Sequence, residues 1–369
     1  VYQALLTRRY LTSKVMPLLA AVAVTLCVAM ELIVWSVMGG FLVMLVESGR
    51  ALIGDVSVSP SHLGFAYYED LIKRLEADPQ VAAACPLIES FGLISLPQSN
   101  TPDTVVIKGI DARFNKVTDY ANSLWWKPLD KPLPKDKKRE DPRLAADNKA
   151  GLEKFYQQGL SLTAPRPAPG RTRAVEGQAG LPMGALVIGI EVGGYNLRHE
   201  EGYREPYFFL PGSSATLSVL PMDARGRVLP EQKTRVFPIA NQFTSGIYEI
   251  DNNTVFVRLD ELQKMLMMDR AERVDPASAG ASPDRVVDPK TGKEIWQEPK
   301  TIVEPARVTH VLVRGKDGVD SNVLRDRCRE IYDAFAADHA NDPLPPQALG
   351  KSGALTWREG SLYPNLHKL

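Results

Sequence analysis

The sequence predicts an α+β protein that begins with a transmembrane helix. Residues 15–46 are almost wholly apolar and carry one charge, Glu31. After residue 55, alternating stretches typical of strands and one amphipathic stretch follow in the order strand, helix, strand, strand, strand. This irregular succession of strands and helices is typical of the α+β class.

The apolar run fits one membrane span. About 20 helical residues cross a hydrocarbon core of roughly 30 Å, and Pro17–Met38 meet this requirement. Pro17 suits the first turn of a helix, where its missing N–H costs little. The run is too long for a cleaved signal peptide, and Leu26 is too large to precede a lipidated Cys27. We therefore expect an uncleaved anchor that includes Pro17, Glu31, Trp35, Gly39 and Gly40.

The charges that flank the span predict its orientation. Arg8, Arg9 and Lys14 precede it, so the positive-inside rule places the N-terminus in the cytoplasm and the residues after about 55 outside. Because a carboxylate is costly in lipid, we expect Glu31 to reach the interface or to face a partner helix. Residues 41–46 are too apolar for a solvated helix. They predict a stalk packed on a neighbour, with Gly39 and Gly40 allowing close approach or a bend.

The exterior region is predicted to consist of regular elements separated by two insertions. Residues 121–180 are rich in proline and charge and are interpreted as an insertion that is partly extended or disordered, and residues 269–305 are interpreted as a polar loop that contains prolines. Trp125 and Trp126 are expected to pin the first insertion to the domain surface, with ligand stacking as the alternative. Strands are expected at 55–59, 81–87, 91–96, 104–110, 215–220, 234–240, 254–257 and 308–313, and helices at 67–77, 259–267 and 319–335.

No motif in the sequence predicts catalysis, a metal or a cofactor. Gly350-Lys351-Ser352 ends like a P-loop, but Pro345 occupies the position of the required glycine. The five histidines show no zinc spacing. With 44 basic and 44 acidic residues, nothing indicates a nucleic-acid binder. Three cysteines form no disulfide framework, although Cys85 and Cys328 could pair in an oxidising compartment.

Several segments, in the same order and spacing, resemble a known family of membrane permeases. They are RRYLTSKV…LIVWSVMGGF, then DVSVSP, IKRLEADPQVAAACPLIESFGLI, VVIKGID and VFPIANQFTSGIYEIDNNTVFVRLDELQKML, with Trp357 near the end. Together they are similar to the N-terminal region of ABC-transporter permeases of the lipoprotein-releasing (LolC and LolE) and MacB-like or FtsX-like family. The resemblance covers residues 5–120, 181–268 and 306–360, and the two insertions depart from it.

The resemblance implies a MacB-type periplasmic domain, in which a split porter-like α+β subdomain carries an inserted, mostly β subdomain. The implied order is a cytoplasmic N-terminus, span and stalk (1–54), a first porter-like segment (55–120), an insertion (121–180), the β-rich subdomain (181–268), a loop insertion (269–305), a second porter-like segment (306–345) and a return segment toward a second span (346–369).

The function implied by the resemblance is mechanical. ATP hydrolysis in the cytoplasm would drive the extraction or release of lipoproteins or other amphipathic cargo at the periplasmic face of the bacterial inner membrane. The implied partners are a cytoplasmic ABC ATPase, a second permease copy or paralogue, the lipid bilayer and a periplasmic lipoprotein carrier. The permease itself would have no ATPase site. The alternatives are a MacB-like exporter of drugs, peptides or toxins, a single-pass sensor or binding ectodomain, and a membrane-anchored enzyme.

A candidate partner-binding site lies at residues 221–230. The segment joins two expected strands and is longer than a tight turn, so we expect a protruding hairpin. An ordinary solvated hairpin is the alternative. In LolC-like permeases a hairpin at this place hooks the lipoprotein carrier, which here assigns the contact to Pro221, Met222, Arg225, Arg227, Leu229 and Pro230.

Overall fold

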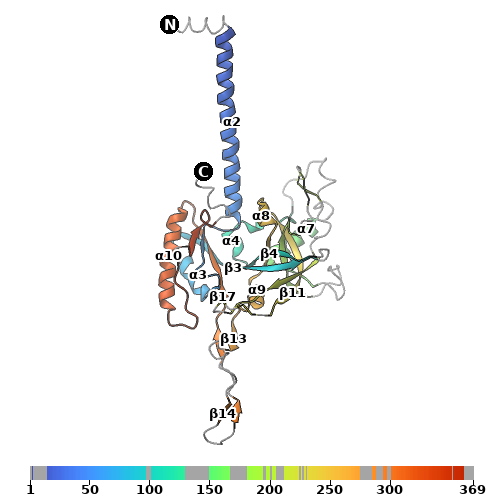
Figure 1. Cartoon of the computed structure of the whole chain (residues 1–369), viewed down its shortest axis with the longest axis vertical. Coiled ribbons are helices and arrows are strands. Elements are labelled where there is room, and N and C mark those ends of the chain that lie inside the picture. Colours follow the sequence, from blue (N-terminus) through green and yellow to red (C-terminus); the bar gives the residue numbers. More distant parts are fainter. Residues whose placement is uncertain are drawn as a thin grey trace. The chain divides into compact units, whose positions relative to one another are not determined.

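The computed structural model describes residues 2, 15–96, 101–128, 149–166, 181–193, 197–199, 202–204, 212–223, 226, 228–229, 231–274, 285–287, 294–296, 301–350 and 352–360. The chain divides into two compact units, Val1–Ser48 and Gly49–Leu369. The predicted α+β class and the long apolar helix at the N-terminus are confirmed (Figure 1).

Helix α2 (Val15–Ala51) contains the predicted span. Leu19–Gly40 form a stretch of 22 residues with a mean hydropathy of 2.2, which is long and apolar enough to cross a membrane. Leu, Ala and Met are strong helix formers, and no proline follows Pro17 within the helix. The helix passes through Gly39 and Gly40 without interruption and continues over residues 41–51.

The first half of the second unit, here called the α/β half, is an open antiparallel sheet. Its strands lie in the order β19 (Ala354–Thr356), β1 (Val56–Val58), β18 (His310–Gly315) and the beginning of β3 (Val81–Ser95). Helices α3 (Tyr68–Glu76) and α10 (Ser321–Asp338) contact each other and cover one face (Figure 1). The carboxylate of Asp320 caps α10 by accepting a bond from the Asn322 N–H at 2.8 Å.

The second half is a closed ring of six strands, here called the barrel. Beyond residue 87, β3 leaves β18 and pairs with β10 (Ser214–Val219), from Gly92↔Val219 to Ser95↔Thr216. The ring continues through β11 (Lys233–Phe243), β7 (Leu186–Gly189), β12 (Thr254–Arg258) and β4 (Asp103–Ile110), which returns to β3. The β11–β7 and β12–β4 pairs are parallel and the other four are antiparallel.

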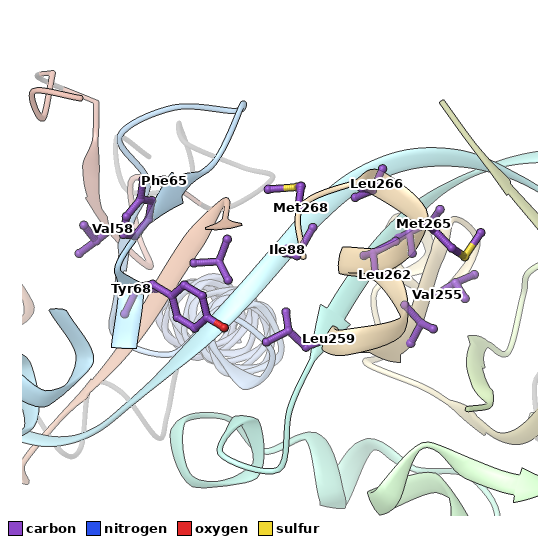
Figure 2. Packing of buried hydrophobic residues seen from close by; sticks show 14 of the residues in the cluster. Val58, Phe65, Tyr68, Ile88, Val255, Leu259, Leu262, Met265, Leu266 and Met268 are labelled. Carbon is purple, nitrogen blue, oxygen red and sulfur yellow. The ribbon is translucent and has the colours of Figure 1, made fainter. Parts of the chain in front are cut away.

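The first of two apolar clusters, here called the core, runs through both halves, and the second includes Leu52, Leu87 and Phe256. Helix α9 (Leu259–Leu266) contacts β3, β4, β11 and β12. It packs closely on β4, because a Cβ added to Gly109 would lie only 2.8 Å from Leu262 Cδ2. Figure 2 shows a portion of this core: Leu262 and Met265 come from α9, Val255 from β12, and Val58 and Phe65 from the α/β half. The predicted strands 81–87 and 91–96 are one 15-residue strand, β3, which both halves share.

The first insertion is more regular than expected. It contains α7 (Lys149–Ser161), whose Leu152, Tyr156 and Leu160 recur at helical spacing; Leu152 is buried, and Tyr156 and Leu160 pack against the second apolar cluster. Trp126 is 1% exposed. Its backbone N–H donates to Asn241 Oδ1 at 3.0 Å and its indole N–H donates to Gln242 Oε1 at 3.1 Å. Trp126 thus anchors this segment to β11, which agrees with the pinning interpretation.

The second insertion contains hairpin strands where the sequence indicated a loop. Its outer pair is β13 (Ala271–Val274) with β16 (Thr301–Glu304), and its inner pair is β14 (Arg285–Val287) with β15 (Glu294–Trp296). The strands are short and interrupted by polar residues, so their alternation is too weak to predict. The smaller elements are α4 (Phe114–Val117), α5 (Tyr120–Ser123), α8 (Tyr248–Asp251) and the two-stranded pairs β2 (Phe65–Ala66) with β17 (Arg307–Val308), β5 (Thr163–Pro165) with β6 (Pro182–Gly184), and β8 (Leu197–His199) with β9 (Gly202–Arg204).

Candidate functional site

The residues that follow α2 are fixed into the α/β half. Leu52 is 2% exposed and belongs to the apolar cluster of Leu312 and Val117. Gly54 has φ +75°, and a Cβ there would lie 2.9 Å from Val117 Cγ1 and 3.2 Å from the Val313 carbonyl oxygen. Only glycine therefore fits this turn without displacement. The chain leaves the long helix through a buried and closely packed connection.

Asp55 fastens this connection to two strands. Its N–H donates to the Val313 carbonyl at 3.0 Å, and its carboxylate accepts a bond from the Gly315 N–H at 2.9 Å. Its own carbonyl accepts a bond from the Trp357 N–H at 3.0 Å. The Arg314 guanidinium lies 3.9 Å from the carboxylate, which is buried. A buried carboxylate needs such donors, because a lone charge removed from water is costly.

The chain later returns to the same place. Strand β19 is antiparallel to β1, with Thr356 opposite Val56, so the residues after Thr356 run back toward Asp55. A turn at 356–360 is held by Glu359, whose carboxylate accepts the Thr356 N–H at 2.9 Å and pairs with Arg325 at 2.8 Å. The entry and return segments, Leu52–Asp55 and Ala354–Glu359, are here called the junction.

Sequence reasoning missed the junction as a site. It identified Trp357 only through the resemblance and took Asp55 as the start of a strand. The available signal was the pair Gly54-Asp55 directly after a long helix, because glycine commonly follows a helix end. The long-range partners Val313 and Trp357 have no local signature.

Within residues 221–230, where a hairpin was predicted, the described residues form one β-bridge and one further backbone hydrogen bond. Met222 and Val228 form an antiparallel bridge, and the Leu229 N–H donates to the Pro221 carbonyl at 2.9 Å. Met222 and Val228 are exposed, whereas Pro221 is buried. Arg225, Arg227 and Pro230 lie outside the described residues. Of the predicted set, Met222 is thus exposed, Leu229 is half-buried and Pro221 is buried, whereas the exposed Val228 was not predicted.

The tip of the hairpin does not stand free of the domain. At Gly226, which has φ +83°, an added Cβ would lie 3.2 Å from Leu63 Cδ1. Leu63 belongs to the loop between β1 and β2 in the α/β half. The hairpin therefore extends from the barrel to the α/β half.

The predicted anchor residues all lie on α2. Trp35 is 73% exposed and Glu31 is exposed, and a Cβ at Gly39 or Gly40 would meet nothing within 4 Å. The side chain of Pro17 lies outside the described residues. Helix α2 thus presents apolar residues along the whole stretch Leu19–Gly40.

Burial shifts the pKa values of two cysteines and one histidine in the second unit. Cys85 and Cys328 are buried and unpaired, in clusters on opposite faces of the sheet. Burial raises the pKa of both thiols, that of Cys328 to about 12. His310 lies beside Glu89 and Lys108, and burial lowers its pKa to about 4 although Glu89 acts in the opposite sense. Among the residues that the structure describes, no group of His, Cys, Asp and Glu could hold a metal ion.

The predicted P-loop look-alike has no phosphate-binding context in the described portion of the chain. Residues 343–350 belong to no helix or strand, and Lys351 lies outside the described residues. A P-loop connects a strand to the N-terminus of a helix.

No protein-family model matches the sequence, and no curated protein matches it. Among solved structures, the periplasmic region of MacB from Actinobacillus actinomycetemcomitans aligns at 9% identity and a TM-score of 0.34, over 78% of this chain and 86% of that chain. The extracellular domain of the noncanonic ABC-type transporter YknZ from Gram-positive bacteria aligns at 8% identity and a TM-score of 0.32, over 82% of this chain and 98% of that chain. At these scores neither neighbour assigns this chain to a family, and the function is inferred from the chain's own features.

Proposed function

We propose that this chain is the membrane anchor and extracytoplasmic domain of an ABC-transporter permease. In this role α2 crosses the inner membrane with its N-terminus in the cytoplasm, and the residues after about 55 lie outside. Movement produced by a cytoplasmic ATPase reaches the domain through the helix. The permease contributes no ATPase site of its own.

The observation that carries the proposal is the junction. Helix α2 continues 11 residues beyond Gly40 as helix before Leu52 enters the core. Asp55 then bonds to β18 and to the returning Trp357 backbone. A flexible linker would absorb a displacement, whereas a helix joined to a packed core passes it on. Strand β3 extends the connection, because it belongs to both the α/β half and the barrel.

The proposal is tested by loosening the junction in the full-length transporter assembled with its ATPase. Four Gly-Ser residues are inserted between Ala51 and Leu52, and a matched insertion of the same length is placed after Asp317, in an exposed turn. We expect the first insertion to abolish ATP-driven cargo release while ATPase binding persists, and the second to leave release unchanged. Equal release by both variants would contradict a mechanical role for the junction.

For the cargo, we propose lipoprotein release with the hairpin as the docking site for a soluble carrier. Exposed Met222 and Val228, which bridge the two arms of the hairpin, support this, because exposed apolar side chains suit a protein contact. Met222→Asp and Val228→Asp should each weaken binding to the purified carrier about tenfold, a loss of about 1.4 kcal/mol. Val323→Asp, at another exposed valine, on α10, is the control. Unchanged binding would favour an exporter or a subunit that does not contact the carrier.

A further inference from the structure

Helix α2 carries a carboxyl group deep within its apolar stretch. Glu31 is the thirteenth of the 22 residues from Leu19 to Gly40. At a rise of 1.5 Å per residue it lies about 14 Å from the Gly40 end and about 18 Å from the Leu19 end. Even long Lys and Arg side chains reach the membrane surface only from positions near a helix end, and a glutamate side chain is shorter still.

Helix α2 itself provides few hydrogen-bond donors near this carboxyl group. Within the described residues Glu31 makes no hydrogen bond or ion pair. Its neighbours at helical spacing are Cys27, Val28, Val34 and Trp35, and of these only Trp35 has a strong donor, its indole N–H. The hydroxyl of Thr25 already donates to the Ala21 carbonyl at 2.8 Å. A carboxyl group left alone in hydrocarbon is strongly unfavourable.

We infer that Glu31 faces another transmembrane helix, which presents a basic or amide side chain to it. This inference rests on the proposed membrane span. A second copy of α2 fits poorly, because it would bring Glu31 against Glu31, and like charges disfavour each other. The complementary group is a cation or an N–H donor, and within a membrane such groups face protein and pair with one another. The contact face of α2 is then the one that bears Cys27, Glu31 and Trp35.

The helix provides matched positions for a test. Cys27 and Trp35 lie one turn before and one turn after Glu31, so both flank it on one face. Ile33 is two residues away, about 200° around the helix, and lies on the opposite face. A photo-activated cross-linking residue is placed at each of these positions in the full-length protein, in its native membrane.

Probes at positions 27 and 35 should form cross-links to a different transmembrane segment that contains Arg, Lys, His, Asn or Gln. The probe at position 33 should label lipid. Glu31→Leu should reduce the protein cross-links about fivefold or more, in line with one interhelical hydrogen bond. Glu31→Gln, whose amide can still accept a hydrogen bond, should retain them.

Labelling of lipid alone from positions 27 and 35 would overturn the inference. Cross-links to the same face of a second α2 would also overturn it, as would full yields in Glu31→Leu. The absence of lipid labelling from position 33 would contradict the membrane span itself, so failure of this inference and failure of the proposed function give different results.

Discussion

The α/β half and the barrel share strand β3, but one is open and the other is closed. The α/β sheet ends at β19, a three-residue edge strand, whereas the six barrel strands form a ring without an edge. A strand at an open edge is hydrogen-bonded on one side only, so it can move with little loss of free energy. A strand in a closed ring is paired on both sides, so the ring must lose hydrogen bonds between two strands to change shape. We therefore expect the barrel to be harder to deform than the α/β half.

The largest effect is expected where the barrel wall meets its covering segment. Trp126→Ala removes a buried indole together with its hydrogen bond to Gln242, and it should destabilise the protein by about 3–5 kcal/mol. Denaturant unfolding measures this loss. Val323→Ala, at an exposed position of α10, is the control and should change stability little. A small loss in Trp126→Ala would show that the segment does not support the barrel.

Closure of the ring is tested at Gly92, where β3 pairs with β10. An added Cβ would lie 2.6 Å from the Ser218 carbonyl oxygen and 2.5 Å from Ile107 Cδ1. Gly92→Ala should therefore cost about 1–3 kcal/mol in the same unfolding experiment. Gly350→Ala is the matched control, because nothing lies within 4 Å of its Cβ position. If both variants were equally stable, β10 would not close against β3.

Acid should weaken the place where β3 changes partners. His310 is opposite Leu87 in the ladder, and burial lowers its pKa from 6.5 to about 4, partly offset by Glu89 and reinforced by Lys108 and His62. As the pH falls from about 6.5 to 4, the unfolded chain takes up a proton that the folded protein resists, so stability should decline. Thermal melting across this range should show the decline, and His310→Gln should flatten it. An unchanged slope in that variant would assign the effect to other groups.

The smallest effect concerns the two buried thiols. Burial raises the pKa of Cys85 and Cys328, so both should stay protonated and react slowly with a thiol reagent at pH 8. Denaturant should make both reactive. Rapid labelling of the folded protein would show that one of the two halves opens readily.

The elements of the α/β half were largely predictable from local pattern. Helix α3 was expected at 67–77 and lies at Tyr68–Glu76, and strand β18 was expected at 308–313 and lies at His310–Gly315. Their apolar faces have clear helical or alternating periods. Strand β3 differs because Glu89 and Ser90 interrupt its apolar pattern at the change of partners, so one strand looked like two.

The barrel and the junction could not be predicted in the same way. Ring closure depends on the pairing of Leu93 with Ser218, residues far apart in the sequence, and two ladders are parallel. The Asp55–Trp357 contact likewise joins the start of the domain to its return segment. Such pairings are set by the packing of the whole chain, which a single sequence does not display.

The central claim is that the second unit lies outside a membrane crossed by α2. Val323→Cys places a thiol at an exposed position of α10, while Cys85 and Cys328 are buried and Cys27 lies within Leu19–Gly40, the stretch proposed to cross the membrane. In intact spheroplasts that produce the full-length protein, a membrane-impermeant maleimide should label Val323→Cys without lysis and leave the parent protein unlabelled. Labelling that appears only after the membrane is permeabilised would place the domain in the cytoplasm and contradict the account.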